Sequence, residues 1–429
     1  MNNDIVITGM GVVSPIGASV EDFWQANLIG KSGLRTEQRM DLSDLPCGWV
    51  SAVLSDNIRE SVQARYGHPG RSWVDTIMHA AVDEALDDAQ FQGHLERAAG
   101  LVWSRVWPGP SGSFPEDYPA YLKDMAACHR AVGADLEGMA VYLRERPLGP
   151  EYVDQSKFPG EISARIGQPL ISARVEATCS GGLRGIVEGA RLLQSGKVDF
   201  AIVAASVSRN TPYVLSQYAQ LMALSRWEGA PEQASMPFDR RRSGMVIAEM
   251  AGAIVLETAA HAARRGIRRM HAVIGGWGLA VDTVHVTAPR VEMIEYVVRT
   301  ALNQSKITVN DIDVISAHGT STRLNDVTEA RALHQVFGER MQSIDVSAIK
   351  SLTGHGSAAS GIVESIASAL MMCRGVVPPV VTCTDPDPEC AIRTSLTPVT
   401  RPVGAVLKNS FGFGGQYASM VFTRPSNPR

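Results

Sequence analysis

The stretch from residue 171 to residue 205 constrains the fold more than any other part of the sequence. Residues 171–178 predict a strand, and residues 179–182 form the tight turn Cys-Ser-Gly-Gly. Apolar residues then recur at helical spacing until Gly196, and residues 198–205 predict a second, buried strand. Strand, helix and strand at this spacing predict a βαβ unit, which places the chain in the α/β class.

The second half of the chain repeats this organisation. Residues 314–317 and 346–349 predict strands, and each is followed by a polar loop and an amphipathic helix. The chain closes with a strand at 404–408, a glycine-rich turn and a hairpin-like strand at 417–422. We therefore expect two similar halves, residues 1–258 and 259–429. Aromatic and proline residues replace the regular pattern around residues 101–160, which predicts an inserted cap in the first half.

Composition and charge narrow the classes of function. The chain is 45% hydrophobic, and its 40 basic and 44 acidic side chains give a net charge of −4, which argues against a nucleic-acid binder. No apolar stretch reaches the length of about 20 residues that a membrane span needs, and the N-terminus lacks an export signal. Six scattered cysteines fit free thiols in the cytoplasm. The motifs CxxC, HxH and HExxH do not occur, so the sequence gives little support for a metal site.

Cys179 is the sharpest candidate for a reactive group. It stands where a strand turns into a helix, and the eight residues after it include no acidic side chain. Unpaired N–H groups and a partial positive charge at a helix start favour the thiolate, which is the nucleophilic form. From this turn alone, a buried and inert cysteine is an equally good interpretation. The other five cysteines lack this setting, and we expect them to be buried and inert.

Two histidines occupy similar positions. His318 opens the loop His-Gly-Thr-Ser-Thr after a strand, and His355 lies in the segment Lys-Ser-Leu-Thr-Gly-His, also after a strand. Loops at the ends of strands in α/β proteins are where binding groups gather. One such histidine alone would more often be structural. Two, together with Cys179 in an equivalent turn, predict a shared site.

Three further features complete the candidate site. Lys350 precedes His355 by five residues, and a buried positive charge there would keep both imidazoles neutral. Glu364 on the following helix is its natural counter-ion, although both residues could equally be solvated. The segment Asn409–Gly415, Asn-Ser-Phe-Gly-Phe-Gly-Gly, does not match a phosphate-binding loop. Such a turn can offer a backbone N–H to a carbonyl oxygen, and taken alone it is simply a hairpin turn.

Together these segments resemble the β-ketoacyl synthase family. The similarity runs in order through VITGMGVVSPIG at the start, EATCSGG, MPFDRRRSGMVIAEMAGAIVLE, AHGTSTRLND, KSLTGHGSAASGIVESIASALM and NSFGFGG. The set of Cys, HGTST, K-x-x-TGH and NSFGFGG resembles most the elongating branch with its Cys-His-His pattern. The resemblance implies a thiolase-like fold, with two βαβ halves packed as α-β-α-β-α layers.

The resemblance also implies roles for individual residues. It makes Cys179 the acyl-accepting nucleophile and His318 and His355 the pair that serves decarboxylation and condensation, with Lys350 and Glu364 in support. The backbone amides of Cys179 and Phe413 would form the oxyanion hole, and Phe413 would gate the acyl chain. Thr320 and Thr322 would contact pantetheine. Asp326 and Glu329 match structural positions.

By this resemblance the chain is an acyltransferase that joins an enzyme-bound acyl group to a malonyl-type thioester by decarboxylative Claisen condensation. The implied reaction needs no metal or organic cofactor. The implied partner is an acyl carrier protein bearing phosphopantetheine thioesters, with basic patches at Arg240–Arg242 and among Arg264–Arg269 as candidate docking surfaces. A homodimer is expected, with a ketosynthase heterodimer as the alternative. Gln416-Tyr417 after GFGG, and Lys408 before Asn409, depart from the usual pattern and favour specialised polyketide or fatty-acid assembly. An acyltransferase or a malonyl decarboxylase is the rival activity, and a degradative thiolase ranks low.

Overall fold

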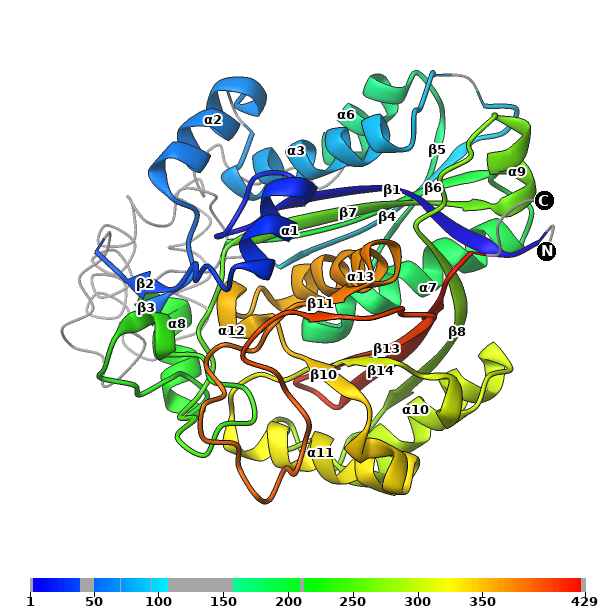
Figure 1. Cartoon of the computed structure of the whole chain (residues 1–429). Coiled ribbons are helices and arrows are strands. Elements are labelled where there is room, and N and C mark those ends of the chain that lie inside the picture. The colour runs from blue at the N-terminus through cyan, green and yellow to red at the C-terminus, as the bar shows by residue number, and fades with distance from the viewer. Residues whose placement is uncertain are drawn as a thin grey trace, which may run out of the picture.

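The computed structural model describes residues 3–38, 50–69, 71–93, 95–106, 157–208 and 212–425. Its main sheet has ten strands in the order β10-β9-β13-β14-β8-β1-β7-β6-β4-β5. The two halves of this sheet are joined where β1 meets β8, through the register pairs Val6–Val273 and Ile7–Ala272. Figure 1 shows helices above, between and below the two halves, which gives the five α-β-α-β-α layers.

Each half of the sheet contributes five strands. The first half consists of β1 (Ile5–Val13), β7 (Met250–Thr258), β6 (Phe200–Val207), β4 (Ala99–Val106) and β5 (Leu170–Arg174). The second half consists of β8 (Ala272–Val281), β14 (Gln416–Thr423), β13 (Ala405–Gly412), β9 (Val314–Ser316) and β10 (Asp345–Ser347). Short two-stranded ribbons pair β2 (Arg35–Thr36) with β3 (Val50–Ser51) and β11 (Val376–Val377) with β12 (Val399–Thr400).

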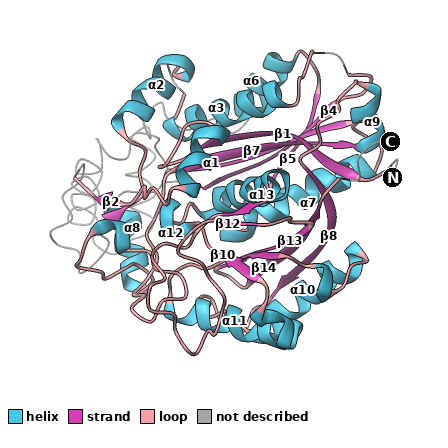
Figure 2. Cartoon of the chain, viewed as in Figure 1, coloured by secondary structure: helices cyan, strands magenta, loops and turns pink. Residues whose placement is uncertain are grey.

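The helices form three layers (Figure 2). The middle layer is the pair α7 (Gly181–Gln194) and α13 (Ser357–Arg374), which lies between the two halves of the sheet. The first outer layer includes α3 (Trp73–Asp88) and α6 (Lys157–Ile166), and the second includes α10 (Val291–Ser305) and α11 (Arg323–Phe337). The other α-helices of the described residues are α1 (Val20–Leu28), α2 (Asp56–Tyr66), α8 (Pro212–Gln220), α9 (Ala259–Arg264) and α12 (Lys350–Thr353).

The central helix α13 is buried on all sides, and four serines and Glu364 interrupt its apolar residues. Every residue from Ser357 to Met372 is buried, including its small residues and one carboxylate, Glu364. A helix that is hydrophobic all round is typical of a core position. Its neighbour α7 is amphipathic and buries residues such as Leu183, Ile186 and Val187. The turn with Cys179 leads into the N-terminus of α7, and the loop with His355 leads into the N-terminus of α13.

Three local predictions need correction. The first strand was predicted to end at its glycines, but it continues through Gly9 and Gly11 to Val13. Helix α3 packs so closely on the strand that a Cβ at Gly9 would lie 2.0 Å from the Ala85 carbonyl oxygen. The glycines therefore permit close helix–sheet packing and do not end the strand. Residues 101–106, predicted as irregular, belong to β4, a buried strand with a nearly continuous apolar run. Residues 350–353, predicted as the end of a strand and a loop, form the short helix α12.

The predicted cap and the predicted boundary between the two halves stay predictions. Most of the expected cap, residues 107–156, is not among the described residues. The division at 258/259 falls where β7 ends and α9 begins, and it stays a prediction. Within the part of the chain that is described, no helix is both long enough and apolar enough to cross a membrane.

Candidate active site

Cys179 lies in a short 3-10 turn, Thr178–Ser180, that leads directly into α7. It is half-buried, and the first turn of α7 carries no acidic side chain. Thr178 has a φ of +47°, a conformation that non-glycine residues rarely adopt. Such backbone strain is often found at functional turns. The predicted setting of Cys179 at a helix start is therefore present in the structure.

The hairpin of β13 and β14 holds this turn from the other side. Ser410 Oγ donates to the Cys179 carbonyl oxygen at 2.8 Å, and Thr178 Oγ1 donates to the Phe413 carbonyl oxygen at 3.0 Å. Gly412 makes the approach possible, because a Cβ there would lie 2.0 Å from Thr178 Oγ1 and 3.0 Å from the Cys179 nitrogen. The glycine-rich segment is therefore both a hairpin turn and one wall around Cys179.

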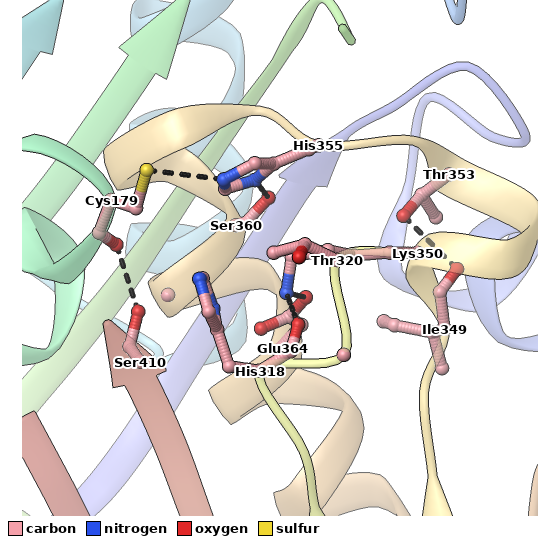
Figure 3. A network of polar contacts seen from close by, with 12 residues as sticks. Cys179, His318, Thr320, Ile349, Lys350, Thr353, His355, Ser360, Glu364 and Ser410 are labelled. Carbon is pink, nitrogen blue, oxygen red and sulfur yellow. Dashed lines mark hydrogen bonds and ion pairs between the residues drawn. The ribbon is translucent and has the colours of Figure 1, made fainter. Parts of the chain in front are cut away.

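His355 contacts the thiol directly. Its Nε2 lies 3.1 Å from Cys179 Sγ (Figure 3). The residue sits between α12 and α13, and its backbone N–H donates to the Val246 carbonyl oxygen at 2.7 Å. Ser360 Oγ lies 3.5 Å from Nδ1 and accepts a bond from the Gly356 N–H at 2.8 Å. The imidazole is thus fixed from both its backbone and its far ring nitrogen.

His318 stands beside His355 with its ring nearly perpendicular. The two ring centroids are 5.5 Å apart and the rings are inclined by 82°. The His318 loop is held by Glu329, whose carboxylate accepts the His318 N–H at 2.8 Å and the Gly319 N–H at 2.9 Å. Phe411 packs against the other side of the His318 ring, with centroids 5.5 Å apart. The side chains of Cys179, His318 and His355 therefore lie together, as the sequence predicted.

Lys350 and Glu364 form a buried ion pair beside His318 (Figure 3). Lys350 Nζ lies 2.5 Å from Glu364 Oε1 and donates to the His318 carbonyl oxygen at 2.6 Å. Both side chains are almost wholly inaccessible to solvent, at 2% and 3%. The predicted pairing is present, and it fixes the backbone at His318.

Burial and positive charge together keep the two imidazoles neutral. Removal from water lowers the pKa of His318 and of His355 well below the usual value, and the Lys350 ammonium lowers both further. His318 Nδ1 is buried and has no hydrogen-bond partner among the described residues. Protonation would place a second N–H donor in that position, where it would also be unpaired. Neutral imidazoles are therefore the favoured state at neutral pH.

A cavity of about 610 Å³ gives access to these groups. Its lining includes Cys179, His318 and His355 at the inner end, and also Thr320, Thr322 and Phe413. Thr320 Oγ1 and Thr322 Oγ1 lie 2.9 Å apart on the loop before α11. All the predicted side chains that face substrate therefore share one cavity.

The remaining described cysteines differ from Cys179. Burial raises the pKa of Cys383 to about 11 and that of Cys390 to about 12, so both stay as thiols. Cys373 is exposed, contrary to the prediction that it is buried, because it lies near the end of α13. Cys47 and Cys128 lie outside the described residues. Among the described side chains, no group of three or more His, Cys, Asp or Glu is placed to hold a metal ion.

Several contact residues of the site were not predicted. Phe411, Ser410 and Gly412 all lie in the segment that was singled out, but their contacts with His318 and the Cys179 turn depend on how the hairpin packs. A structural role is expected for Glu329 from the sequence, and the structure shows which one: its carboxylate anchors the His318 loop.

The chain matches the family models described as "Beta-ketoacyl synthase, N-terminal domain", over residues 2–63 and 76–262, and "Beta-ketoacyl synthase, C-terminal domain", over residues 271–384. The first model alone covers more than half of the chain. The chain belongs to the β-ketoacyl synthase family. The resemblance drawn from the sequence motifs is thereby confirmed, and this β-ketoacyl synthase is an enzyme of the acyltransferase class.

Relatives cover nearly the whole β-ketoacyl synthase. It is 30% identical over 442 residues to 3-oxoacyl-[acyl-carrier-protein] synthase 2 of Coxiella burnetii, with 98% of each chain covered. It is 31% identical over 425 residues to a Streptomyces coelicolor protein whose name links it to actinorhodin polyketide β-ketoacyl synthesis, with 97% of this chain and 88% of that protein covered. A solved structure, "The ishigamide ketosynthase/chain length factor", superposes with a TM-score of 0.83 at 27% identity and covers 99% of this chain and 100% of that one. The predicted thiolase-like fold is confirmed by this similarity.

Proposed function

We propose that Cys179, His318 and His355 catalyse a decarboxylative Claisen condensation between an acyl group bound to Cys179 and a malonyl-type thioester. The observation that carries the proposal is the 3.1 Å contact between Cys179 Sγ and His355 Nε2, with the neutral His318 ring beside it in an accessible cavity. Family membership and the names of the relatives support fatty-acid or polyketide assembly as the setting.

The first step loads the acyl group. The Cys179 thiolate attacks the carbonyl carbon of an acyl thioester, the C–S bond to the carrier breaks, and the carrier leaves as its thiol after taking up a proton. The start of α7 and the neighbouring imidazole of His355 favour the thiolate. The backbone amides of Cys179 and Phe413 are the proposed donors to the oxyanion, because the hairpin brings this glycine-rich turn against the Cys179 turn.

The second step generates the carbon nucleophile. The C–C bond to the carboxylate of the malonyl group breaks, CO2 leaves, and the electron pair moves into an enolate. Neutral imidazoles at His318 and His355 are placed to donate N–H bonds to the enolate oxygen, because both lie in the cavity beside Cys179. Lys350 and Glu364 hold the His318 backbone and the local charge.

The third step joins the two groups. The enolate carbon attacks the acyl-Cys179 carbonyl, a C–C bond forms, and the C–S bond to Cys179 breaks to regenerate the thiolate. The apolar rings near the thiol, Phe411 and Phe413, limit the access of water to the enolate. Phe413 is half-buried at the hairpin tip and packs near Tyr218, which fits its proposed role as a gate for the acyl chain.

An acyl carrier protein is the proposed donor of both thioesters, because the Coxiella burnetii relative is named for that carrier. Thr320 and Thr322 line the cavity and are the proposed contacts for pantetheine. We expect a dimer, either of two copies or with a related subunit as in the ishigamide ketosynthase/chain length factor. We place the enzyme in the cytoplasm, where Cys179 would remain reduced.

Intact-protein mass spectrometry with acyl-carrier and malonyl-carrier thioesters tests the proposal. We expect an acyl adduct on the wild type, no adduct on Cys179→Ala, and a β-ketoacyl product once the malonyl carrier is added. Cys383→Ala is the matched control, because that buried thiol should not be acylated.

The same experiment separates the alternatives. An adduct that is transferred without chain extension would establish an acyltransferase, and CO2 release without a longer product would establish a malonyl decarboxylase. Absence of an adduct with every acyl donor would leave the chain as the non-catalytic member of a heterodimer.

A further inference from the structure

Lys408 is a second buried lysine close to the candidate active site. It lies in the middle of β13, where it pairs in register with Ser316 of β9 and Met420 of β14. Its side chain is fully buried, with 0% exposure. A cation in such a position is costly unless an anion compensates it, so its partners determine what it does.

Glu364 is the anion that compensates Lys408. Lys408 Nζ lies 2.7 Å from Glu364 Oε2 in an ion pair that lacks hydrogen-bond geometry, and it donates a hydrogen bond to the Asn409 carbonyl oxygen. The other carboxylate oxygen of Glu364, Oε1, forms the ion pair with Lys350 Nζ. One carboxylate is therefore shared by two ammonium groups, and this trio carries a net charge of +1 when both lysines are protonated.

The other charged group near the trio is Glu329, on α11. It accepts bonds from the backbone at His318 and Gly319 and from Asn409 Nδ2 at 3.1 Å. Its negative charge favours the protonated form of Lys408. Among the described residues, the titratable groups that act on Lys408 from the packed elements are thus Glu364, Lys350 and Glu329. The His318 and His355 imidazoles are close enough for the charge of Lys408 to act on them.

We propose that Lys408 is a positioning residue whose ammonium group shares Glu364 with Lys350 and, with Lys350, keeps the His318 and His355 imidazoles uncharged. This inference rests on the proposed function, because the uncharged rings matter through decarboxylation. Lys408 does not line the cavity, so it acts through the histidines and not on substrate.

The electrostatics of the site agree with this geometry. The positive charge of Lys408 lowers the pKa of both His318 and His355, in addition to the effects of burial and Lys350. Burial lowers the pKa of Lys408 itself to about 8, while Glu364 opposes that shift. Lys408 is therefore mostly charged at neutral pH, where the histidines must remain neutral.

The test compares Lys408→Met and Lys408→Gln with the wild type in a malonyl-carrier decarboxylation assay across pH. Both variants remove the charge, and Glu364 keeps Lys350 as a partner. We expect the acidic limb of the rate profile to move up by about one pH unit in both, with rates within roughly twofold of wild type at pH 8.5. Met420→Leu, at the neighbouring register position, is the matched control for a change of core packing without a change of charge.

Two results of this assay would overturn the proposal. The first is a pH profile of the Lys408 variants that superposes on that of the wild type. The second is a rate loss of equal size at every pH, which a merely structural role predicts.

If the wild type releases no CO2 at any pH, the proposed function fails, and NMR titration of the histidine ring protons still tests the inference. In the wild type, the His318 and His355 resonances should show an inflection near pH 8, where Lys408 loses its proton. Its absence would also exclude the role, even if neither variant folds.

Discussion

The position of the Cys179 turn depends on a residue that has no side chain. Gly412 lets the β13–β14 hairpin approach until Thr178 and Cys179 are within bonding distance of it. We expect Gly412→Ala to displace the Cys179 turn, since the new Cβ would lie 2.0 Å from Thr178 Oγ1. A displacement of about 1 Å costs roughly 100-fold in rate, which the rate of Cys179 acylation by mass spectrometry would reveal.

The control for this variant is Gly100→Ala in β4. There a Cβ would meet the Ala201 Cβ at 3.2 Å, far from the site, and the expected effect is on stability alone. Acylation at the wild-type rate in Gly412→Ala would show that the close contact at the hairpin tip is not needed.

The lowered pKa of His318 and of His355 predicts how the rate of decarboxylation depends on pH. Because burial and Lys350 lower the pKa of His318 and His355 well below the usual value, both stay neutral above about pH 6.5. We expect the rate of CO2 release from malonyl carrier to be flat from pH 6.5 to 7.5 and to fall only in more acidic solution, as the rings become protonated. A titration of the rate with a midpoint near 6.5, the value for an exposed histidine, would contradict this assignment. Heat-inactivated enzyme at each pH controls for uncatalysed loss of CO2.

At the scale of elements, the crossing of α7 and α13 places Cys179 relative to His355. The crossing is close because Gly182 has no side chain: a Cβ there would lie 2.3 Å from the Ala358 carbonyl oxygen and 2.9 Å from the Ile362 nitrogen. Neither of these atoms belongs to a flexible side chain. The two helices therefore cannot move apart without displacing Cys179 and His355, which lie next to their N-termini.

We expect Gly182→Ala to cost about 1–3 kcal/mol of unfolding free energy, as overpacking usually does, and to slow Cys179 acylation. Gly185→Ala on the same helix is the matched control, because its Cβ would meet a side-chain methyl of Val203 at 3.2 Å. Its better helix propensity, worth about 1 kcal/mol, should offset that contact. Denaturant unfolding and acylation rates measure both effects. Equal unfolding free energies and equal acylation rates for Gly182→Ala and Gly185→Ala would show that the crossing of α7 and α13 tolerates a methyl group.

At the scale of the whole molecule, the two arginine patches predicted from the sequence differ in their position relative to the cavity. Arg226, Arg241 and Arg323 line the cavity that leads to Cys179, whereas none of the residues 264–269 does. The predicted patch at Arg240–Arg242 needs correction, because Arg242 is buried and paired with Asp387 at 2.6 Å. Arg242 also contributes to the cavity lining, but this ion pair holds its side chain inside the fold with only 2% exposure.

Binding of an acidic carrier should therefore depend on the cavity mouth. We expect Arg323→Glu to raise the KM for acyl carrier protein about tenfold at low salt, with the difference shrinking as salt is added. Arg268→Glu, an exposed charge reversal beyond α9, is the control and should leave KM unchanged. Steady-state kinetics at two salt concentrations test this, and the opposite ranking of the two variants would place the carrier near α9.

The α/β class, the order of the elements and the reactive residues follow from local sequence. The apolar periodicity that defines α7, and the loops after β9 and β10, are short-range features. The Cys, HGTST, TGH and NSFGFGG segments together were specific enough to identify the family before any contact was known. The predicted end of β1 and the predicted burial of Cys373 were wrong, because each depends on which distant element packs there.

Tertiary structure alone decided how the site is connected. Cys179 and His355 are 176 positions apart, and Lys408 meets Glu364 across two elements, so no local pattern reports their distances. The sharing of one carboxylate by two lysines, the unpaired Nδ1 of His318 and the burial of Arg242 exist only once the halves of the sheet enclose α7 and α13. Charge and solvation depend on surroundings in space, whereas the sequence lists neighbours along the chain.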